Sequence, residues 1–148
     1  MPSFGRASLS KLQFLHPDLV RLCQAVVQGY DCTVLETVRS ADQQRENVAK
    51  GVSKTFYSKH VLIGGRQFAE AVDLAPYPLK WPKRDSPTYQ KDLARFYCFG
   101  GYVMATARCL NIPLTWGGDW AGTWDFHENA FDDLVHFELG VIRAPSPF

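Results

Sequence analysis

The sequence predicts a single domain that mixes helices with short strands. With 148 residues, the chain is long enough for one hydrophobic core but not for two. Its hydrophobic content of 46% and charged content of 21% are typical of a soluble globular protein. Segments with a helical spacing of apolar residues alternate with short β-rich runs. We therefore expect one domain over residues 1–148, with an N-terminal arm at 1–15 and a loose tail at 144–148.

Three segments have the features of helices. Residues 17–28 begin with a proline and an acid, which suit a first helical turn, and a glycine follows them. Residues 40–50 begin with a serine that can cap a helix. Residues 88–110 form the longest expected helix, although its central Gly100 and Gly101 lower the helix propensity. We expect another element to pack closely against this glycine pair.

Four runs have the composition or the alternation of strands: 32–38, 68–74, 114–116 and 135–139. The segment 52–67 is expected to be a loop that carries His60. In the last run, His136 and Glu138 share one face because side chains alternate along a strand. Asp133 would point to the opposite face of an ideal strand. It can therefore approach His136 only if it lies in a turn before that strand.

The composition excludes two broad classes of partner. Sixteen basic and fifteen acidic residues leave a formal net charge of +1 without long runs of one sign, which gives no electrostatic basis for binding nucleic acid. No segment reaches the roughly 18 apolar residues needed to span a membrane, so we expect no membrane insertion. The N-terminal residues lack the apolar stretch of a signal peptide, so we expect synthesis in the cytoplasm.

Two features leave alternatives open. The four cysteines form no CxxC pair, which suits free thiols in a reducing cytosol, but bridges joining Cys23 to Cys32 or Cys98 to Cys109 are compatible with the sequence. The segment 119–133 is rich in acids without an EF-hand pattern. A second metal such as Ca²⁺ is therefore an alternative there.

Two histidines and an aspartate are the candidate metal ligands. His60, Asp73 and His136 supply two imidazoles and a carboxylate, the usual set for a catalytic zinc ion that keeps its fourth position open. Asp133 is the candidate general base that takes a proton from the attacking water. Glu138 shares the face of His136, which makes it the competing candidate for the base or for a hydrogen-bond partner that supports a metal ligand.

Arg39 and Gln44 are candidates for contacts to the substrate. Arg39 follows the first expected strand, and Gln44 lies in the short helix after it. An arginine and an amide at the mouth of a cleft can hold a carboxylate or a developing oxyanion. The alternative for each is a solvated surface side chain.

A set of short motifs follows in one order along residues 39–138. The motifs are Arg39-Ser40 with Gln44, Ser58-Lys59-His60, Gly64-Gly65-Arg66, Ala71-Val72-Asp73-Leu74, Trp116-Gly117-Gly118-Asp119-Trp120, and Asp133-Leu134-Val135-His136-Phe137-Glu138. Together they resemble the pattern of zinc-dependent peptidoglycan peptidases of the D-alanyl-D-alanine carboxypeptidase type. The chain most closely resembles the phage endolysins among them, which are L-alanyl-D-glutamate peptidases.

The resemblance implies both a fold and a set of roles. The fold would be α+β, with helices backing a small antiparallel sheet, as in D,D-peptidases and the Hedgehog N-terminal domain. The sheet would hold Zn²⁺ through His60, Asp73 and His136, and Asp133 would be the general base. Arg39 and Gln44 would contact the substrate or the oxyanion. Ser58 would be a supporting hydrogen-bond residue.

One spacing departs from the family pattern. The family usually places the aspartate ligand seven positions after the first histidine, whereas Asp73 follows His60 by 73 − 60 = 13 positions. We interpret the difference as an enlarged loop, around residues 61–66, that keeps the ligand geometry.

The expected function is that of a phage endolysin. It would hydrolyse the L-Ala/D-Glu amide bond of the peptidoglycan stem peptide and so lyse the cell wall. We expect a monomer that acts on the wall after release by a holin-like membrane partner. One alternative is a D,D-carboxypeptidase that removes terminal D-Ala on the same scaffold. The other is a non-catalytic, zinc-stabilised domain for wall binding or signalling.

Overall fold

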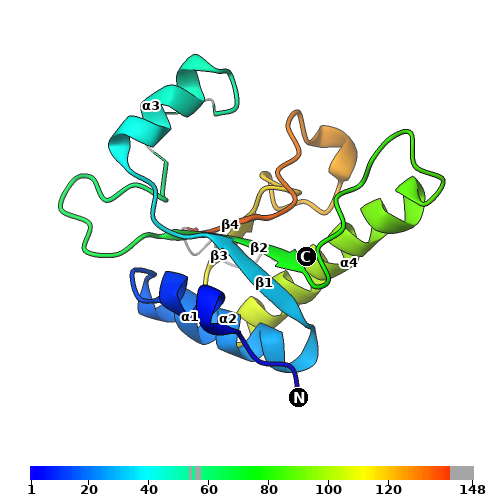
Figure 1. Ribbon diagram of the computed structural model, residues 1–148, viewed down its shortest axis with the longest axis horizontal. Coiled ribbons are helices and arrows are strands. Elements are labelled where there is room, and N and C mark those ends of the chain that lie inside the picture. Colours follow the sequence, from blue (N-terminus) through cyan, green and yellow to red (C-terminus); the bar gives the residue numbers. More distant parts are fainter. Residues whose placement is uncertain (54, 56–57, 141–148) are drawn as a thin grey trace.

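Four short strands form one antiparallel sheet (Figure 1). The structure is a computed structural model and describes residues 1–53, 55 and 58–140. The predicted loose tail at 144–148 lies outside the described residues. The strand order is β1-β2-β4-β3, with bounds β1 (Cys32–Glu36), β2 (Ala71–Pro76), β4 (His136–Leu139) and β3 (Leu114–Trp116). The expected α+β fold with a small antiparallel sheet is confirmed.

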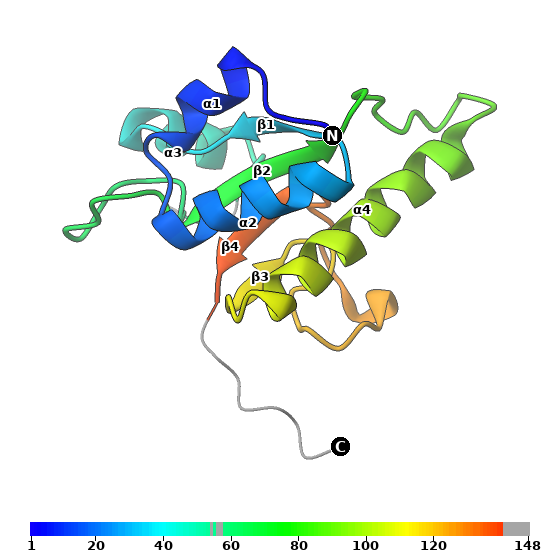
Figure 2. The same cartoon turned by 90° about the horizontal axis from the view of Figure 1, so that it is seen from below.

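Helices cover one face of this sheet and leave the other face to the functional side chains. The two longer helices, α2 (Pro17–Gly29) and α4 (Tyr89–Cys109), cross the same face (Figure 2). The short α3 (Ala41–Ala49) lies on the opposite side (Figure 1). Apolar side chains fill the space between the sheet and the two longer helices, among them Leu19, Leu22, Val26, Val34, Val72, Leu74, Phe99, Val103 and Phe137.

The N-terminal arm expected at 1–15 contains a helix, α1 (Arg6–Leu12). Its local sequence signal is weak because the helix is short and has no side-chain cap. Ser8 Oγ accepts a hydrogen bond from Val34 N at 3.2 Å, and Lys11 Nζ donates to Val34 O at 3.0 Å. Polar groups of α1 thus bond backbone N–H and C=O groups of β1. Because β1 is an edge strand, these backbone groups would otherwise stay unpaired.

Several predicted boundaries shift by a few residues. β1 ends at Glu36 instead of residue 38, because the strand register shifts between Val34 and Glu36. β2 starts at Ala71 instead of residue 68. In the short helix, Ser40 caps α3 as expected, since its Oγ accepts from Gln43 N at 3.0 Å. The main features of each element are therefore readable from local sequence, while the ends are set by tertiary contacts.

The glycine pair of α4 proves to be asymmetric. A Cβ atom at Gly100 would lie 2.2 Å from Trp116 Cζ2, whereas a Cβ atom at Gly101 would meet nothing within 4 Å. The close packing expected at this pair is therefore confirmed at Gly100 alone. The indole of Trp116 is fully buried against the helix. A glycine is required here so that α4 can approach β3.

We expect Gly100→Ala to destabilise the fold by about 1–3 kcal/mol, because the added methyl overpacks the Trp116 ring. Gly101→Ala is the matched control and should be neutral or stabilising by about 0.5–1 kcal/mol, because alanine favours the helix and the space is open. Urea unfolding of both variants measures the difference. Equal effects of the two substitutions would contradict the packing argument.

Candidate metal centre

The register of the sheet places two of the candidate ligands side by side. Asp73 in β2 is the direct antiparallel partner of His136 in β4. Their strand neighbours Val72 and Phe137 are buried in the core. Because side chains alternate along a strand, Asp73 and His136 both point to the face opposite the core. Directly paired residues on one face have neighbouring Cβ atoms, so the two side chains can share a ligand.

The third candidate, His60, comes from a loop that is fixed to the sheet. Arg39 N donates to His60 O at 2.9 Å, and Glu70 N donates to Lys59 O at 2.9 Å. Within the loop, Ser58 Oγ accepts from His60 N at 3.2 Å. These bonds join the loop to the chain on both sides of it, after β1 and before β2. Ser58 is thus placed to support the backbone of His60.

Three ligand atoms form a nearly equilateral triangle. His60 Nε2 lies 3.1 Å from Asp73 Oδ1 and 3.2 Å from His136 Nδ1, and His136 Nδ1 lies 3.3 Å from Asp73 Oδ1. An ion that binds tetrahedrally at about 2.0 Å separates its ligands by about 3.3 Å. The three atoms therefore have the spacing of three corners of a tetrahedral site, and the cluster can hold a metal ion.

The outer hydrogen bonds of both histidines direct lone pairs toward the centre of this triangle. His60 Nδ1 lies 2.7 Å from Thr37 O, which can only accept, so the proton of the neutral ring is on Nδ1. His136 Nε2 lies 2.9 Å from Glu138 Oε2 and donates to that carboxylate. Both inner nitrogens then carry lone pairs. Three acceptors without a donor need a proton or a metal ion between them.

The electrostatics of the cluster also favour a positive charge. Burial of Asp73 raises its pKa, but hydrogen bonds from His136 and His60 lower the pKa of this carboxyl well below its ordinary value. Burial of His136 lowers its pKa, but the hydrogen bonds to Asp73 and Glu138 raise the pKa of this imidazole to about 9. Asp73 thus keeps its negative charge, and His136 holds a proton more readily than a free imidazole when no metal ion is bound.

Asp133 lies in the turn before β4, the position from which it can serve His136. Its backbone N donates to Gly117 O at 2.9 Å, and its backbone O accepts from His136 N at 3.2 Å. Burial raises the pKa of the Asp133 carboxyl, Asp73 raises it further, and the nearby cationic groups lower it. The carboxyl therefore holds a proton more readily than an exposed aspartate would.

Trp116 and Gly117 hold this turn, a role that the sequence did not reveal. Trp116 Nε1 donates to Leu134 O at 2.9 Å, and Gly117 N donates to His136 O at 2.9 Å. A Cβ atom at Gly117 would lie 2.3 Å from Asp133 O. The glycine therefore allows the close approach of the two backbones that places Asp133.

Arg39 is held in a network with Glu36 and Gln44. Its Nε and Nη2 donate to the two carboxylate oxygens of Glu36 at 3.0 and 2.6 Å, and its Nη1 donates to Gln44 Oε1 at 2.7 Å. The hydrogen bond to Glu36 raises the pKa of Arg39, so the guanidinium stays charged. Glu36 was missed in the sequence, although an acid three residues before an arginine is a signal for such a pair.

Gln44 is a support for Arg39 rather than a free group. It is fully buried, and its amide nitrogen donates to Ser53 Oγ at 2.8 Å and to Thr55 O. Both ends of the amide are thus used inside the protein. The expected contact of Gln44 with substrate stays a prediction, and this geometry favours an indirect role through Arg39.

The acid-rich segment 119–133 uses its acids to build a loop around η1 (Phe126–Glu128). Asp119, for example, accepts from the backbone nitrogens of Thr123 and Trp124 at 3.1 and 2.9 Å. Among the residues that the structure describes, only the cluster of His60, Asp73 and His136 has the grouping of a metal site. The Ca²⁺ alternative thus gains no support from the described part of the chain.

Trp120 lies against one of the candidate metal ligands. The Trp120 ring packs on His136, with ring centroids 5.4 Å apart.

All four cysteines are free thiols in the structure: Cys23, Cys32, Cys98 and Cys109. The alternative of a bridge from Cys23 to Cys32 or from Cys98 to Cys109 is therefore wrong in this structure. Burial raises the pKa of Cys32 to about 12, which makes this thiol unreactive.

Comparisons with known proteins agree on one family. The L-alanyl-D-glutamate peptidase of Escherichia phage T5 is 26% identical over 133 residues, which cover 84% of this chain and 86% of that protein. The L-alanyl-D-glutamate peptidase of Listeria phage A118 is 28% identical over 97 residues, and they cover 66% of this chain but 29% of that protein.

The fold is similar to a solved structure of the same activity class. The crystal structure of the Serratia marcescens L-Ala D-Glu endopeptidase ChiX superposes with a TM-score of 0.67 and 28% identity, covering 93% of this chain and 89% of that one. A family model described as phage L-alanyl-D-glutamate peptidase matches residues 2–140. Since this match covers nearly the whole chain, the protein belongs to the phage L-alanyl-D-glutamate peptidase family.

Proposed function

We propose that this protein is a zinc-dependent endopeptidase that hydrolyses the L-Ala/D-Glu amide bond in peptidoglycan stem peptides. Membership of the family and the names of the relatives support the substrate and the bond. One observation carries the metal chemistry: the ligand atoms of His60, Asp73 and His136 form a triangle with sides of 3.1–3.3 Å, and the Asp133 turn adjoins it.

Zinc is the metal that this donor set fits best. Two imidazole nitrogens and one carboxylate oxygen at tetrahedral spacing are typical ligands of catalytic zinc, which leaves a fourth position for water or substrate. When bound, zinc would act as a Lewis acid that polarises the scissile carbonyl and lowers the pKa of water. Thr37 O and Glu138 would fix the ring orientation of the two histidines from outside.

Asp133 is the proposed general base. Its carboxyl lies within the electrostatic reach of Asp73, His60 and His136, and burial raises its pKa. It would accept the proton of the attacking water and pass it to the leaving amine of D-Glu. Because its pKa is raised, the Asp133 carboxylate binds the proton from water more readily than an exposed aspartate would. The same carboxyl group, now protonated, can then donate this proton to the leaving amine.

Arg39 is the proposed anchor for negative charge. Glu36 and Gln44 use three of its five N–H groups, which fixes the plane of the guanidinium and leaves two donors. The charge of Arg39 also acts on Asp73 and Asp133, so it lies close to the metal centre. It would bind a substrate carboxylate or the developing oxyanion there.

The biological setting follows from the phage relatives. We propose a lysin that is made in the host cytoplasm, reaches the wall with the help of a holin-like membrane partner and acts as a monomer. In the part of the chain that the structure describes, no helix has the length and apolarity to cross a membrane.

Digestion of purified sacculi tests the proposed bond. Mass analysis of the fragments should reveal new N-terminal D-Glu, because the amide after L-Ala is cut. Zinc removal by a chelator should abolish the reaction, and added Zn²⁺ should restore it. Release of terminal D-Ala without new D-Glu termini would instead identify a D,D-carboxypeptidase. No product from the zinc-loaded protein would contradict both enzymatic readings.

Substitution of the base and of a ligand should have separable effects. We expect Asp133→Asn to lower the hydrolysis rate by about 10²–10⁴ while bound zinc stays equimolar, because the base is lost and the ligands remain. His136→Ala should lose the metal together with the activity. Metal analysis beside a rate assay distinguishes the two. Full activity in Asp133→Asn would rule out its role as the base.

Glu138 should contribute to metal affinity through His136. We expect Glu138→Ala to weaken Zn²⁺ binding by about 10–100-fold, because the imidazole loses the acceptor that orients it. Lys59→Met is the matched control: it removes the ion pair with Glu138 at 3.4 Å and a hydrogen bond to Leu139 O, and it keeps the bond from His136 to the carboxylate. Zn²⁺ titration against a competing chelator measures both. A similar loss in the control would point to the ion pair instead.

A further inference from the structure

The segment that joins β2 to α4 lies at one end of the longest axis of the molecule (Figures 1 and 2). All of residues 77–84 except Pro82 are exposed. The candidate ligands and the candidate base of the metal centre all lie outside this segment. We call residues 77–84, together with Lys91 and Arg95 in the first two turns of α4, the cationic patch.

The cationic patch concentrates positive charge in a chain that is almost neutral. Residues 77–95 contain five basic and two acidic residues, a net charge of +3, whereas the whole chain has +1. The rest of the chain is therefore net acidic. The five basic residues are Lys80, Lys83, Arg84, Lys91 and Arg95. Of the two acids, Asp92 already accepts a hydrogen bond from Thr88 Oγ1 at 2.7 Å.

The cations of the patch are not neutralised by neighbouring acids. Elsewhere in the described chain, most basic side chains pair with an acid. Arg21, for example, lies 3.5 Å from Asp18, and Lys50 lies 3.9 Å from Glu46. Among the described residues, no acid forms an ion pair with any of the five basic side chains of the patch. The patch therefore presents a positive potential to the solvent.

Three large side chains with apolar surface lie exposed among these cations. Tyr77 is 57% exposed, Leu79 is 38% exposed and Trp81 is 51% exposed. The Trp81 ring stacks on the buried Phe96 of α4, with ring centroids 5.4 Å apart. This contact holds the indole in place while about half of it stays in contact with solvent. A side chain that is already fixed loses little conformational freedom when it binds a partner.

We propose that the cationic patch is a peripheral docking surface for membranes that contain anionic phospholipids. Tryptophan and tyrosine rings favour the headgroup region of a bilayer, and leucine favours the boundary with the acyl chains. Each Lys or Arg near the surface adds attraction to the anionic headgroups. A soluble polyanion would use the cations alone and leave Leu79 in water. The proposal concerns the place at which the protein resides, and it does not depend on the bond that is cleaved.

Sedimentation with lipid vesicles tests the proposal. The full chain is mixed with vesicles of phosphatidylcholine alone, or with vesicles of phosphatidylcholine and phosphatidylglycerol in equal parts. We expect binding to the mixed vesicles to be at least about tenfold stronger, because only these vesicles attract the cations. High salt should remove most of this difference by screening. Equal binding to both kinds of vesicle, or binding to neither, would overturn the proposal.

A pair of charge variants separates the patch from the overall charge. Lys83→Gln combined with Arg84→Gln should weaken binding to the mixed vesicles by about 10–30-fold, because two cations near the lipid surface are lost. Arg6→Gln combined with Arg108→Gln is the matched control. It also removes two exposed cations, but these lie in α1 and at the other end of α4. The control should bind as the unmodified protein does, and an equal loss in both variants would overturn the patch as the docking surface.

Variants of the apolar side chains distinguish a membrane from a soluble polyanion. Trp81→Ala should weaken binding to the mixed vesicles by about tenfold, because the indole no longer enters the headgroup region. Leu79→Ser should weaken it in the same direction and leaves the stack of Trp81 on Phe96 intact. The midpoint of urea unfolding is measured for each variant to confirm that the fold is kept. Unchanged vesicle binding in both variants, with displacement of the protein by inorganic polyphosphate, would assign the patch to a soluble polyanion and overturn the membrane proposal.

Discussion

The structure depends on one constraint: three atoms that carry lone pairs must stay within 3.3 Å of one another. Without a cation, this arrangement is repulsive, and the fold opposes the repulsion from several directions. The pairing of β2 with β4 fixes Asp73 against His136. Hydrogen bonds to Thr37 O and Glu138 fix the two rings from behind. A metal ion between the three atoms would remove this repulsion, and the hydrogen bonds behind the rings keep the ligands oriented toward it.

Because side chains alternate along a strand, the core residues and the residues of the metal centre lie on opposite faces of the sheet. Val72 and Phe137 form one pair of the β2–β4 ladder and point into the core, and the next pair, Asp73 and His136, points to the metal centre. The core side still shapes the functional side. Trp116, buried between α4 and the sheet, donates to Leu134 O and so supports the turn that presents Asp133. Close packing at Gly100 therefore has consequences for the position of Asp133.

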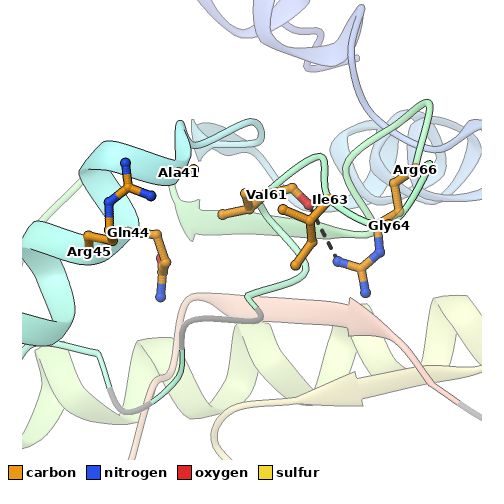
Figure 3. A pocket seen from close by; sticks show the side chains of 7 residues that line it. All are labelled: Ala41, Gln44, Arg45, Val61, Ile63, Gly64 and Arg66. Carbon is orange, nitrogen blue, oxygen red and sulfur yellow. Dashed lines mark hydrogen bonds between the residues drawn. The ribbon is translucent and has the colours of Figure 1, made fainter.

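The segments that surround the metal centre are less regular than the sheet. Arg39 follows a strand whose register shifts near Glu36, and its guanidinium donates to the Glu36 carboxylate. Gln44 then joins α3 to the same guanidinium. Across from that helix, the enlarged loop lines a pocket with Val61, Ile63 and Arg66 (Figure 3). The sheet thus places Asp73 and His136, while the less regular segments place Arg39 and Gln44.

The sequence by itself determined the ligand types, the main helices and strands and the family, because these depend on residue chemistry and local periodicity. It also indicated that Asp133 needs a turn before β4. Tertiary structure decided the rest. Whether His60, thirteen positions from Asp73, reaches the same point depends on loop hydrogen bonds that no local pattern encodes. The helix at Arg6–Leu12, the role of Glu36 and the support from Trp116 likewise arise from contacts between distant segments, and spacing along the chain cannot specify those contacts.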